Sequence, residues 1–205
     1  MRIANQQSAS SAEGWWVYTG RERVPKNVRA VQFAPGVTKI DREAFRDCKD
    51  LAVVSFNEGL RSIHYRAFRG CVSLDNVKFP STVTLVGKGA FGQCTALRTL
   101  ELNDGLREID EWAFKGCARL AFVRIPCSVV ALGEFAFDHC TALTTVELNE
   151  GLHTVGKGAF RDCVALQKIK MPSTVAKVGD FAFLNCHALN GGTASRGAIP
   201  VGYMV

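Results

Sequence analysis

Residues 90–97 read AFGQCTAL, one copy of a pattern Ala-Phe-x-x-Cys-x-x-Leu that occurs seven times in this chain. Successive copies are 23 residues apart, without a single insertion. The phenylalanines of the pattern are Phe45, Phe68, Phe91, Phe114, Phe137, Phe160 and Phe183. A strict period of this length is typical of repeat proteins, in which each unit buries its apolar side chains against its neighbours.

Each copy continues into an alternating apolar pattern, for example Val77 with Phe79 or Val123 with Ile125. Alternation of this kind predicts a β-strand, and the Asn or Pro that follows ends it. A short extended piece and a short helical turn at the next Ala-Phe complete the unit. We therefore expect an α/β solenoid of about seven 23-residue coils. Its parallel β-sheet should lie on the concave face, with the short helical turns and short extended pieces on the other faces.

Two runs carry a resemblance to a known family, PSTVTLVGKGAFGQC at Pro80–Cys94 and PSTVAKVGDFAFLNC at Pro172–Cys186. They resemble leucine-rich repeats of the BspA type, whose unit is LxxVxIPxxVxxIGxxAFxxC, and the likeness covers about residues 28–189. The resemblance implies a leucine-rich-repeat solenoid. It also implies a role in adhesion, because BspA-type proteins of bacteria and protozoan parasites are often surface adhesins.

The chain departs from the commonest leucine-rich consensus, which has Asn or Cys shortly after the strand. The nearest positions here hold Gly59, Thr82 and Gly105, so we do not expect the asparagine hydrogen-bond ladder of that class. Units alternate between NEGL or NDGL turns and PSTV or PCSV turns, which makes the full sequence period 46 residues. The sequence offers no functional reason for this alternation.

The repeat divides the chain into three parts. We expect residues 1–14 to be disordered, residues 15–190 to form the solenoid, and residues 191–205 to form a loose tail. Aromatic residues should cap the N-terminal end of the core: Trp15, Trp16 and Tyr18, together with Val17. No such cap follows Leu189, so the exposed C-terminal edge would allow dimerisation.

Charge and hydropathy narrow the class of protein. The net charge is +6, of which residues 1–30 carry half, so the main body is nearly balanced and nucleic acid is not the favoured partner. No apolar run approaches the roughly twenty residues that a membrane helix needs, so we expect no membrane insertion.

Residues 1–14 lack the apolar stretch of an export signal. We expect a cytoplasmic protein, or a cell-surface protein if a precursor segment has been removed.

Seven of the eight cysteines recur in phase with the phenylalanines, which predicts small buried thiols in a reducing compartment. No CxxC pair occurs and the four histidines are out of phase, so we expect no metal site. Cys127 lies in a turn position and should be exposed.

A partner would meet the outward-facing positions of the strands. The candidate partner-binding residues are Asn76, Lys78, Arg98, Thr99, Glu101, Phe122, Arg124, Thr145 and Glu147. Charges of opposite sign alternate from strand to strand, which suggests a self-neutralising ladder that keeps the sheet soluble. Alternatively, Phe122 with Arg98 and Arg124 has the composition of an interface hot spot at the centre of a concave binding face.

A second column directly follows the phenylalanines and is mostly basic. It contains Arg46, Arg69, Lys115 and Arg161, interrupted by Gly92, Asp138 and Leu184. It suggests either an anionic partner on the convex side or solvated charge, and solvated charge is the more economical interpretation.

The chain has no glycine-rich phosphate loop, no HExxH and no GxSxG motif. We therefore expect no enzymatic activity, no cofactor and no small-molecule substrate. The predicted function is a protein–protein interaction scaffold that binds a partner of unknown identity through the concave strand face. The alternatives are a BspA-like cell-surface adhesin and a binder of anionic polymers.

Overall fold

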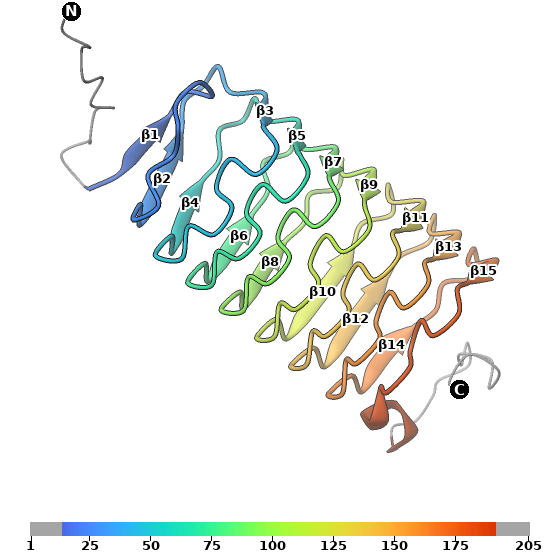
Figure 1. Ribbon diagram of the computed structural model, residues 1–205. Helices are drawn as coiled ribbons and strands as arrows, with labels where there is room; N and C mark the ends of the chain where they lie inside the picture. The colour runs from blue at the N-terminus through green and yellow to red at the C-terminus, as the bar shows by residue number, and fades with distance from the viewer. Residues whose placement is uncertain (1–13, 192–205) are drawn as a thin grey trace, which may run out of the picture.

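Seven coils each contribute one longer strand, here called the wide strand, and one two-residue short strand, and β1 adds an eighth wide strand at the N-terminal end. The computed structural model describes residues 14–191 and shows the coils stacked in sequence order (Figure 1). The wide strands are β1 (Trp16–Tyr18), β2 (Ala30–Phe33), β4 (Val53–Ser55), β6 (Asn76–Lys78), β8 (Thr99–Glu101), β10 (Phe122–Ile125), β12 (Thr145–Leu148) and β14 (Lys168–Lys170). The short strands are β3 (Lys39–Ile40), β5 (Ser62–Ile63), β7 (Leu85–Val86), β9 (Glu108–Ile109), β11 (Ala131–Leu132), β13 (Thr154–Val155) and β15 (Lys177–Val178).

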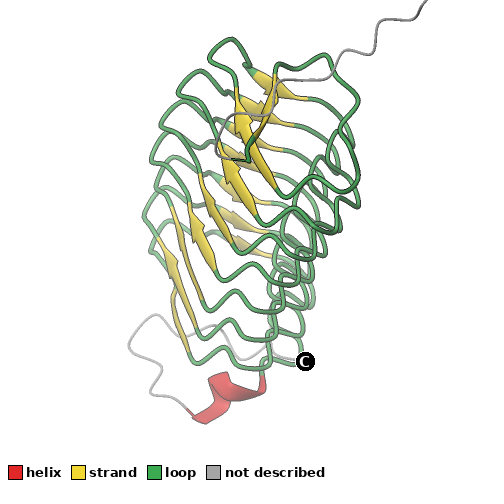
Figure 2. Cartoon of the chain, turned by 90° about the vertical axis from the view of Figure 1, so that its left-hand side faces the viewer, coloured by secondary structure: helices red, strands yellow, loops and turns green. Residues whose placement is uncertain are grey.

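Equivalent strands that pair do so in parallel and in register, and the wide strands form three sheets in sequence order, β1-β2-β4, β6-β8 and β10-β12-β14. Val123 pairs with Val146, and Val146 pairs with Ile169, each step being one repeat. The short strands form a continuous seven-stranded sheet from β3 to β15. Strands thus line two sides of the stack and turns make up the third (Figure 2). The parallel solenoid predicted from the period is confirmed.

The third side of each coil, which contains the Ala-Phe-x-x-Cys pattern, consists of consecutive turns. Ala44 N donates to Asp41 O at 3.3 Å, and Cys48 N donates to Phe45 O at 3.1 Å. Glu43 and Asp47 have positive φ angles of 57° and 56°, which interrupt any helical run. The expected short helical turns therefore take the form of tight turns. In residues 14–191 the one helix is the 3-10 helix η1 (His187–Gly191).

The turns of successive coils are joined by backbone hydrogen bonds and by the phenylalanine column. Phe45 N donates to Ala67 O at 2.8 Å, and the same bond recurs along the stack. The seven phenylalanine rings stack at centroid distances of 4.9–5.6 Å with interplanar angles of 6–12°. All seven rings are buried, as predicted.

The cysteine column is also buried, and each thiol has a specific hydrogen-bond acceptor. Cys71 Sγ donates to Phe45 O at 3.1 Å, and Cys94 Sγ donates to Phe68 O at 3.2 Å. The pattern continues to Cys186, so each thiol connects its coil to the preceding one. The sequence indicated burial but did not reveal this ladder. Cys127 is exposed, as predicted.

The 46-residue alternation has a structural reason, because the two turn types bind each other across the coil interface. Asn103 Nδ2 donates to Ser81 O at 2.9 Å and to Val83 O at 3.0 Å. In the other turn type, Thr82 Oγ1 donates to Leu60 O at 2.6 Å. Asparagines thus reach the preceding coil in every second repeat, at Asn57, Asn103 and Asn149, rather than as a ladder through all coils.

The first strand extends the wide-strand sheet at the N-terminal end. β1 pairs in parallel with β2, and Tyr18 is buried with its ring 5.4 Å from that of Phe33 and 5.1 Å from that of Phe45. The aromatic residue therefore covers the first rings of the core. The expected disordered segment, residues 1–14, and the expected loose tail, residues 191–205, lie outside the described residues except for 14 and 191.

The last coil is less covered than the others. Ile169 and Val178 are half-buried, whereas Val146 and Val155, one repeat earlier, are buried. The described residues contain no helix that is long and apolar enough to span a bilayer.

Candidate functional site

The wide strands present two parallel rows of side chains to solvent. One row contains Asn76, Thr99, Phe122 and Thr145, and the other contains Lys78, Glu101, Arg124 and Glu147. All of these side chains are exposed apart from Thr145, which is half-buried. The alternation of each strand between core and solvent, with Val77, Leu100, Val123 and Val146 buried, produces this arrangement.

Phe122 is the exposed aromatic side chain of this strand face, with 45% of its surface exposed, and Val53 on β4 is exposed to a similar fraction, 47%. In the described part of the chain, neither Arg98 nor Arg124 lies over its ring. Arg98 precedes β8 and pairs with Asp75, with Nε 3.4 Å from Oδ1. Arg98 thus has an anionic partner within the chain, whereas Arg124 lies on the same strand as Phe122.

The charge ladder is only partly formed. Lys78 Nζ lies 3.0 Å from Glu101 Oε2 across neighbouring strands. Arg124 is in register with Glu147, yet within residues 14–191 no carboxylate oxygen lies within 4.0 Å of its guanidinium. The Arg124 guanidinium is therefore available to a partner beside the exposed Phe122 ring.

The basic column on the turn side is largely neutralised by nearby carboxylates. Arg46 pairs with Glu43 at 2.7 Å and with Asp47 at 3.3 Å. Lys115 and Arg161 both pair with Asp138, which the sequence showed only as an interruption of the column. These three cations form ion pairs within the chain while their side chains remain 31–39% exposed.

Asp138 is the one buried charged residue in the described part of the chain. Its carboxylate accepts hydrogen bonds from Arg161 Nε at 2.9 Å and Nη2 at 3.0 Å, and it lies 3.0 Å from Lys115 Nζ and 2.8 Å from His139 Nδ1. Burial alone raises the pKa of Asp138, but the hydrogen bonds from Arg161, Lys115 and His139 outweigh it and lower the pKa below the ordinary 3.8.

Asp138, His139 and Asp162 also place potential metal ligands within 4.8 Å of one another. Both Asp138 oxygens already accept hydrogen bonds from cationic or ring N–H groups. Two adjacent positive side chains further oppose a cation. The cluster is therefore an ion-pair network rather than a metal site.

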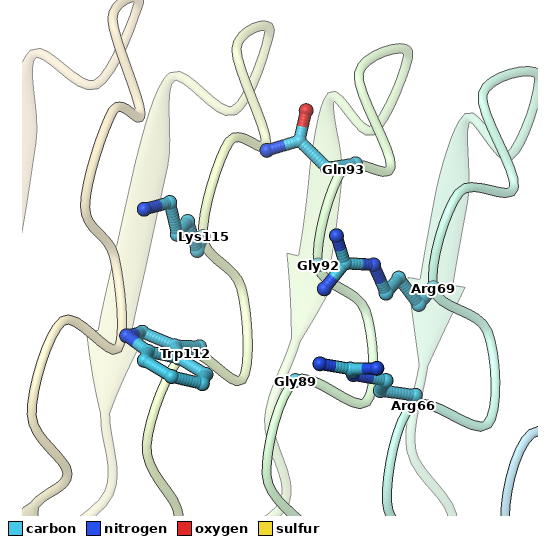
Figure 3. A pocket seen from close by; sticks show the side chains of 7 residues that line it. All are labelled: Arg66, Arg69, Gly89, Gly92, Gln93, Trp112 and Lys115. Carbon is cyan, nitrogen blue, oxygen red and sulfur yellow. The ribbon is translucent and has the colours of Figure 1, made fainter.

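The turn side also contains a pocket of about 260 Å³ (Figure 3). Arg66 and Arg69 line it from one coil, and Trp112 and Lys115 line it from the coil two repeats further on. The coil between them contributes Gly89, Gly92 and Gln93. Arg69, Gly92 and Lys115 belong to the basic column noted in the sequence, but the pocket itself was not predicted. The signal that could have found it was the simultaneous occurrence of glycine in two neighbouring columns of one coil.

Comparison with known protein families identifies the family that this chain matches. The family model for the BspA type leucine rich repeat region matches residues 25–130 and 62–190, in six copies. No curated protein matches the chain.

Solved structures of bacterial leucine-rich repeat proteins are similar. A leucine-rich repeat protein from Eubacterium ventriosum is 26% identical with a TM-score of 0.72, covering 76% of this chain and 42% of that protein. The T. pallidum leucine-rich repeat protein TpLRR is 25% identical with a TM-score of 0.59, covering 85% and 77%. A leucine-rich cell surface protein from Faecalibacterium prausnitzii is 27% identical with a TM-score of 0.50, covering 79% and 52%.

The chain thus spans less than two thirds of the Eubacterium and Faecalibacterium proteins. The family model nevertheless covers most of this chain, and the matched residues are those that form the stacked coils of the structure. The chain belongs to the BspA-type leucine-rich repeat family.

Proposed function

We propose that this protein is a non-enzymatic interaction scaffold that binds another protein through the face of its wide strands. The observation that carries the proposal is the exposed Phe122 ring on the same strand as Arg124, whose guanidinium has no carboxylate partner within residues 14–191, with polar outward-facing side chains on the neighbouring strands β8 and β12. Aromatic and arginine side chains are enriched at the energetic centres of protein interfaces.

The architecture supports this proposal in a second way. In-register pairing joins β10 to β12 and β6 to β8, and backbone hydrogen bonds between coils together with the stacked phenylalanines connect the coils of β8, β10 and β12. A rigid surface loses little conformational freedom on binding, so more of the contact energy is available for affinity.

The experiment is affinity capture with the full chain followed by quantitative identification of bound proteins. The test variant is Phe122→Ala with Arg124→Ala. The matched control is Val130→Ala with Arg107→Ala, because Val130 and Arg107 are also exposed but lie outside the wide strands. The proposal predicts that specific partners are lost with the test variant and kept with the control. Equal capture by both variants would refute it.

Attachment at a cell surface is the second candidate. It is supported by the similarity to the cell surface protein of Faecalibacterium prausnitzii. The eight free cysteines instead support a reducing compartment such as the cytoplasm. Labelling of intact cells with an impermeant amine reagent distinguishes the two, because only a surface protein would be modified before lysis.

A further inference from the structure

The coil that contains Phe91 has glycine at two positions on its turn side where the neighbouring coils have large side chains. Gly89 occupies the column that holds Arg66 and Trp112 in the neighbouring coils, and Gly92 occupies the column that holds Arg69 and Lys115. No other coil in the described part of the chain has glycine in both columns. The pocket therefore arises from this coil alone.

In the coil that contains Phe160, side chains of the neighbouring coils fill the equivalent space. Gly158 lies in the same column as Gly89, and the ring of Phe135 covers it so closely that a Cβ atom there would clash. In the adjoining column the Asp138 carboxylate joins Lys115 and Arg161. At Gly89 and Gly92 neither an aromatic ring nor a carboxylate takes the corresponding place.

The pocket is positively charged and contains two guanidinium groups: the Arg66 group has a long contact to Glu43 and lies 4.6 Å from the centre of the Tyr65 ring, and the Arg69 group has no carboxylate partner in the described residues. Figure 3 shows Arg66 and Arg69 extending across the glycine coil toward the coil of Trp112. Within residues 14–191, Arg69 has no carboxylate partner within 4.0 Å, and the Arg66 Nη1 atom is 3.9 Å from Glu43 Oε1. The Lys115 ammonium points away toward the next coil, where it meets Asp138. Two adjacent guanidiniums suit a multidentate oxyanion.

The remaining lining residues indicate which chemical group is attached to the oxyanion. Trp112 supplies an indole ring, and the Lys88 ammonium already lies 4.6 Å from the centre of that ring. Gln93 supplies the one side-chain acceptor, and no carboxylate lines the pocket. Sugar hydroxyls need acceptors, so this lining suits a flat apolar ring better than a sugar. The volume is below the range of about 300–1,000 Å³ typical of drug-sized ligands, which limits the occupant to about one ring and its substituent.

We propose that this pocket binds an aryl phosphate, with the phosphate on the Arg66 and Arg69 guanidiniums and the ring against Trp112. A phosphate offers three strong acceptor oxygens and a charge of about −1.5 to −2, which matches two guanidiniums better than a carboxylate does. The ligand is either a free aryl phosphate or a phosphotyrosine side chain of a partner protein. This site is on a different side of the coil from the strand face, so its existence does not depend on the proposed scaffold function.

The test is a titration of the full chain with phenyl phosphate. Isothermal titration calorimetry measures the affinity, and the indole N–H signal of Trp112 in NMR spectra reports whether the ligand binds at this pocket. Binding should shift this signal, and Arg69→Gln should weaken the affinity on the order of tenfold. Gly92→Asp should abolish binding, because Asp138 occupies the same column and shows that a carboxylate there pairs with flanking cations. Arg107→Gln, an exposed arginine away from the pocket, should leave the affinity unchanged.

Comparison ligands make the proposal falsifiable. Inorganic phosphate and phenol should each bind more weakly than phenyl phosphate. Equal binding of inorganic phosphate, tighter binding of glucuronate, or unchanged affinity in both pocket variants would overturn the proposal. A phosphotyrosine peptide that binds more tightly than phenyl phosphate assigns the ligand to a partner protein, whereas equal affinities assign it to a free aryl phosphate.

Discussion

Arg161 forms a bidentate ion pair with Asp138, with Nε 2.9 Å from Oδ1 and Nη2 3.0 Å from Oδ2. The two residues occupy the same column in neighbouring coils, and Lys115 completes the pair from the other side. A buried carboxylate thus connects three successive coils on the turn side. Breaking such a pair leaves charges without compensation.

The first prediction concerns the stability contributed by this carboxylate. Asp138→Asn should lower the free energy of unfolding by about 1–3 kcal/mol, because the partly exposed Lys115 and Arg161 lose their anionic partner. Urea denaturation measures the change. Asp104→Asn is the control, since Asp104 is exposed in a turn, and the interpretation is wrong if both variants unfold at the same midpoint.

The second prediction is the pH dependence of the same interaction. Because the pKa of Asp138 is lower in the folded protein than its ordinary value of 3.8, the unfolded chain takes up this proton first on acidification. The stabilisation is complete above pH 3.8 and is lost as the pH falls through the lower, folded-state pKa. The stability difference between the wild type and Asp138→Asn should therefore be large at pH 7 and shrink in acid. A difference that is constant with pH would contradict this assignment.

The third prediction concerns thiol reactivity. Burial raises the pKa of Cys94 to about 12, and it likewise raises that of Cys186 to about 12, so neither thiol is ionised at neutral pH. One thiol, Cys127, should react rapidly with an aromatic disulfide reagent, and the seven buried thiols should react at the rate of unfolding. Cys127→Ser should remove the fast phase alone. Reaction of all eight thiols at one rate would show that the column is accessible.

The fourth prediction tests the close approach of coils at the turn glycines. Gly151 has a φ of 107°, and a Cβ atom there would clash with the Cys127 carbonyl oxygen of the preceding coil. Gly151→Ala should therefore destabilise the protein by about 2–4 kcal/mol.

Gly36 provides a matched control, because it occupies the same repeat position in the first coil and no atom lies within 4 Å of the place that a Cβ atom would take there. Gly36→Ala should leave stability unchanged or raise it by up to about 1 kcal/mol. Thermal unfolding of both variants measures the contrast. Equal effects would mean that coil-to-coil contact does not require glycine at this position.

The core was predictable from the sequence because its residues repeat without insertion. A side chain such as Phe91 must take the same environment as Phe68 and Phe114, so one repeat predicts the others. The same reasoning distinguished Cys127 from the seven cysteines in phase. The turn side was less predictable, since the positive φ angles at Glu43 and Asp47 are not evident from residue type.

The period of 23 residues thus determined the stack, the strand register and the buried columns, because identical coils can bury their apolar side chains only against one another. The tertiary structure alone decided the contacts between unlike residues in the exposed columns. It placed Asp138 between Lys115 and Arg161, and it formed a pocket at Gly89 and Gly92 into which Arg66 and Arg69 extend. Such contacts depend on the direction of each side chain and on the depth of each turn, which the repeat pattern does not specify.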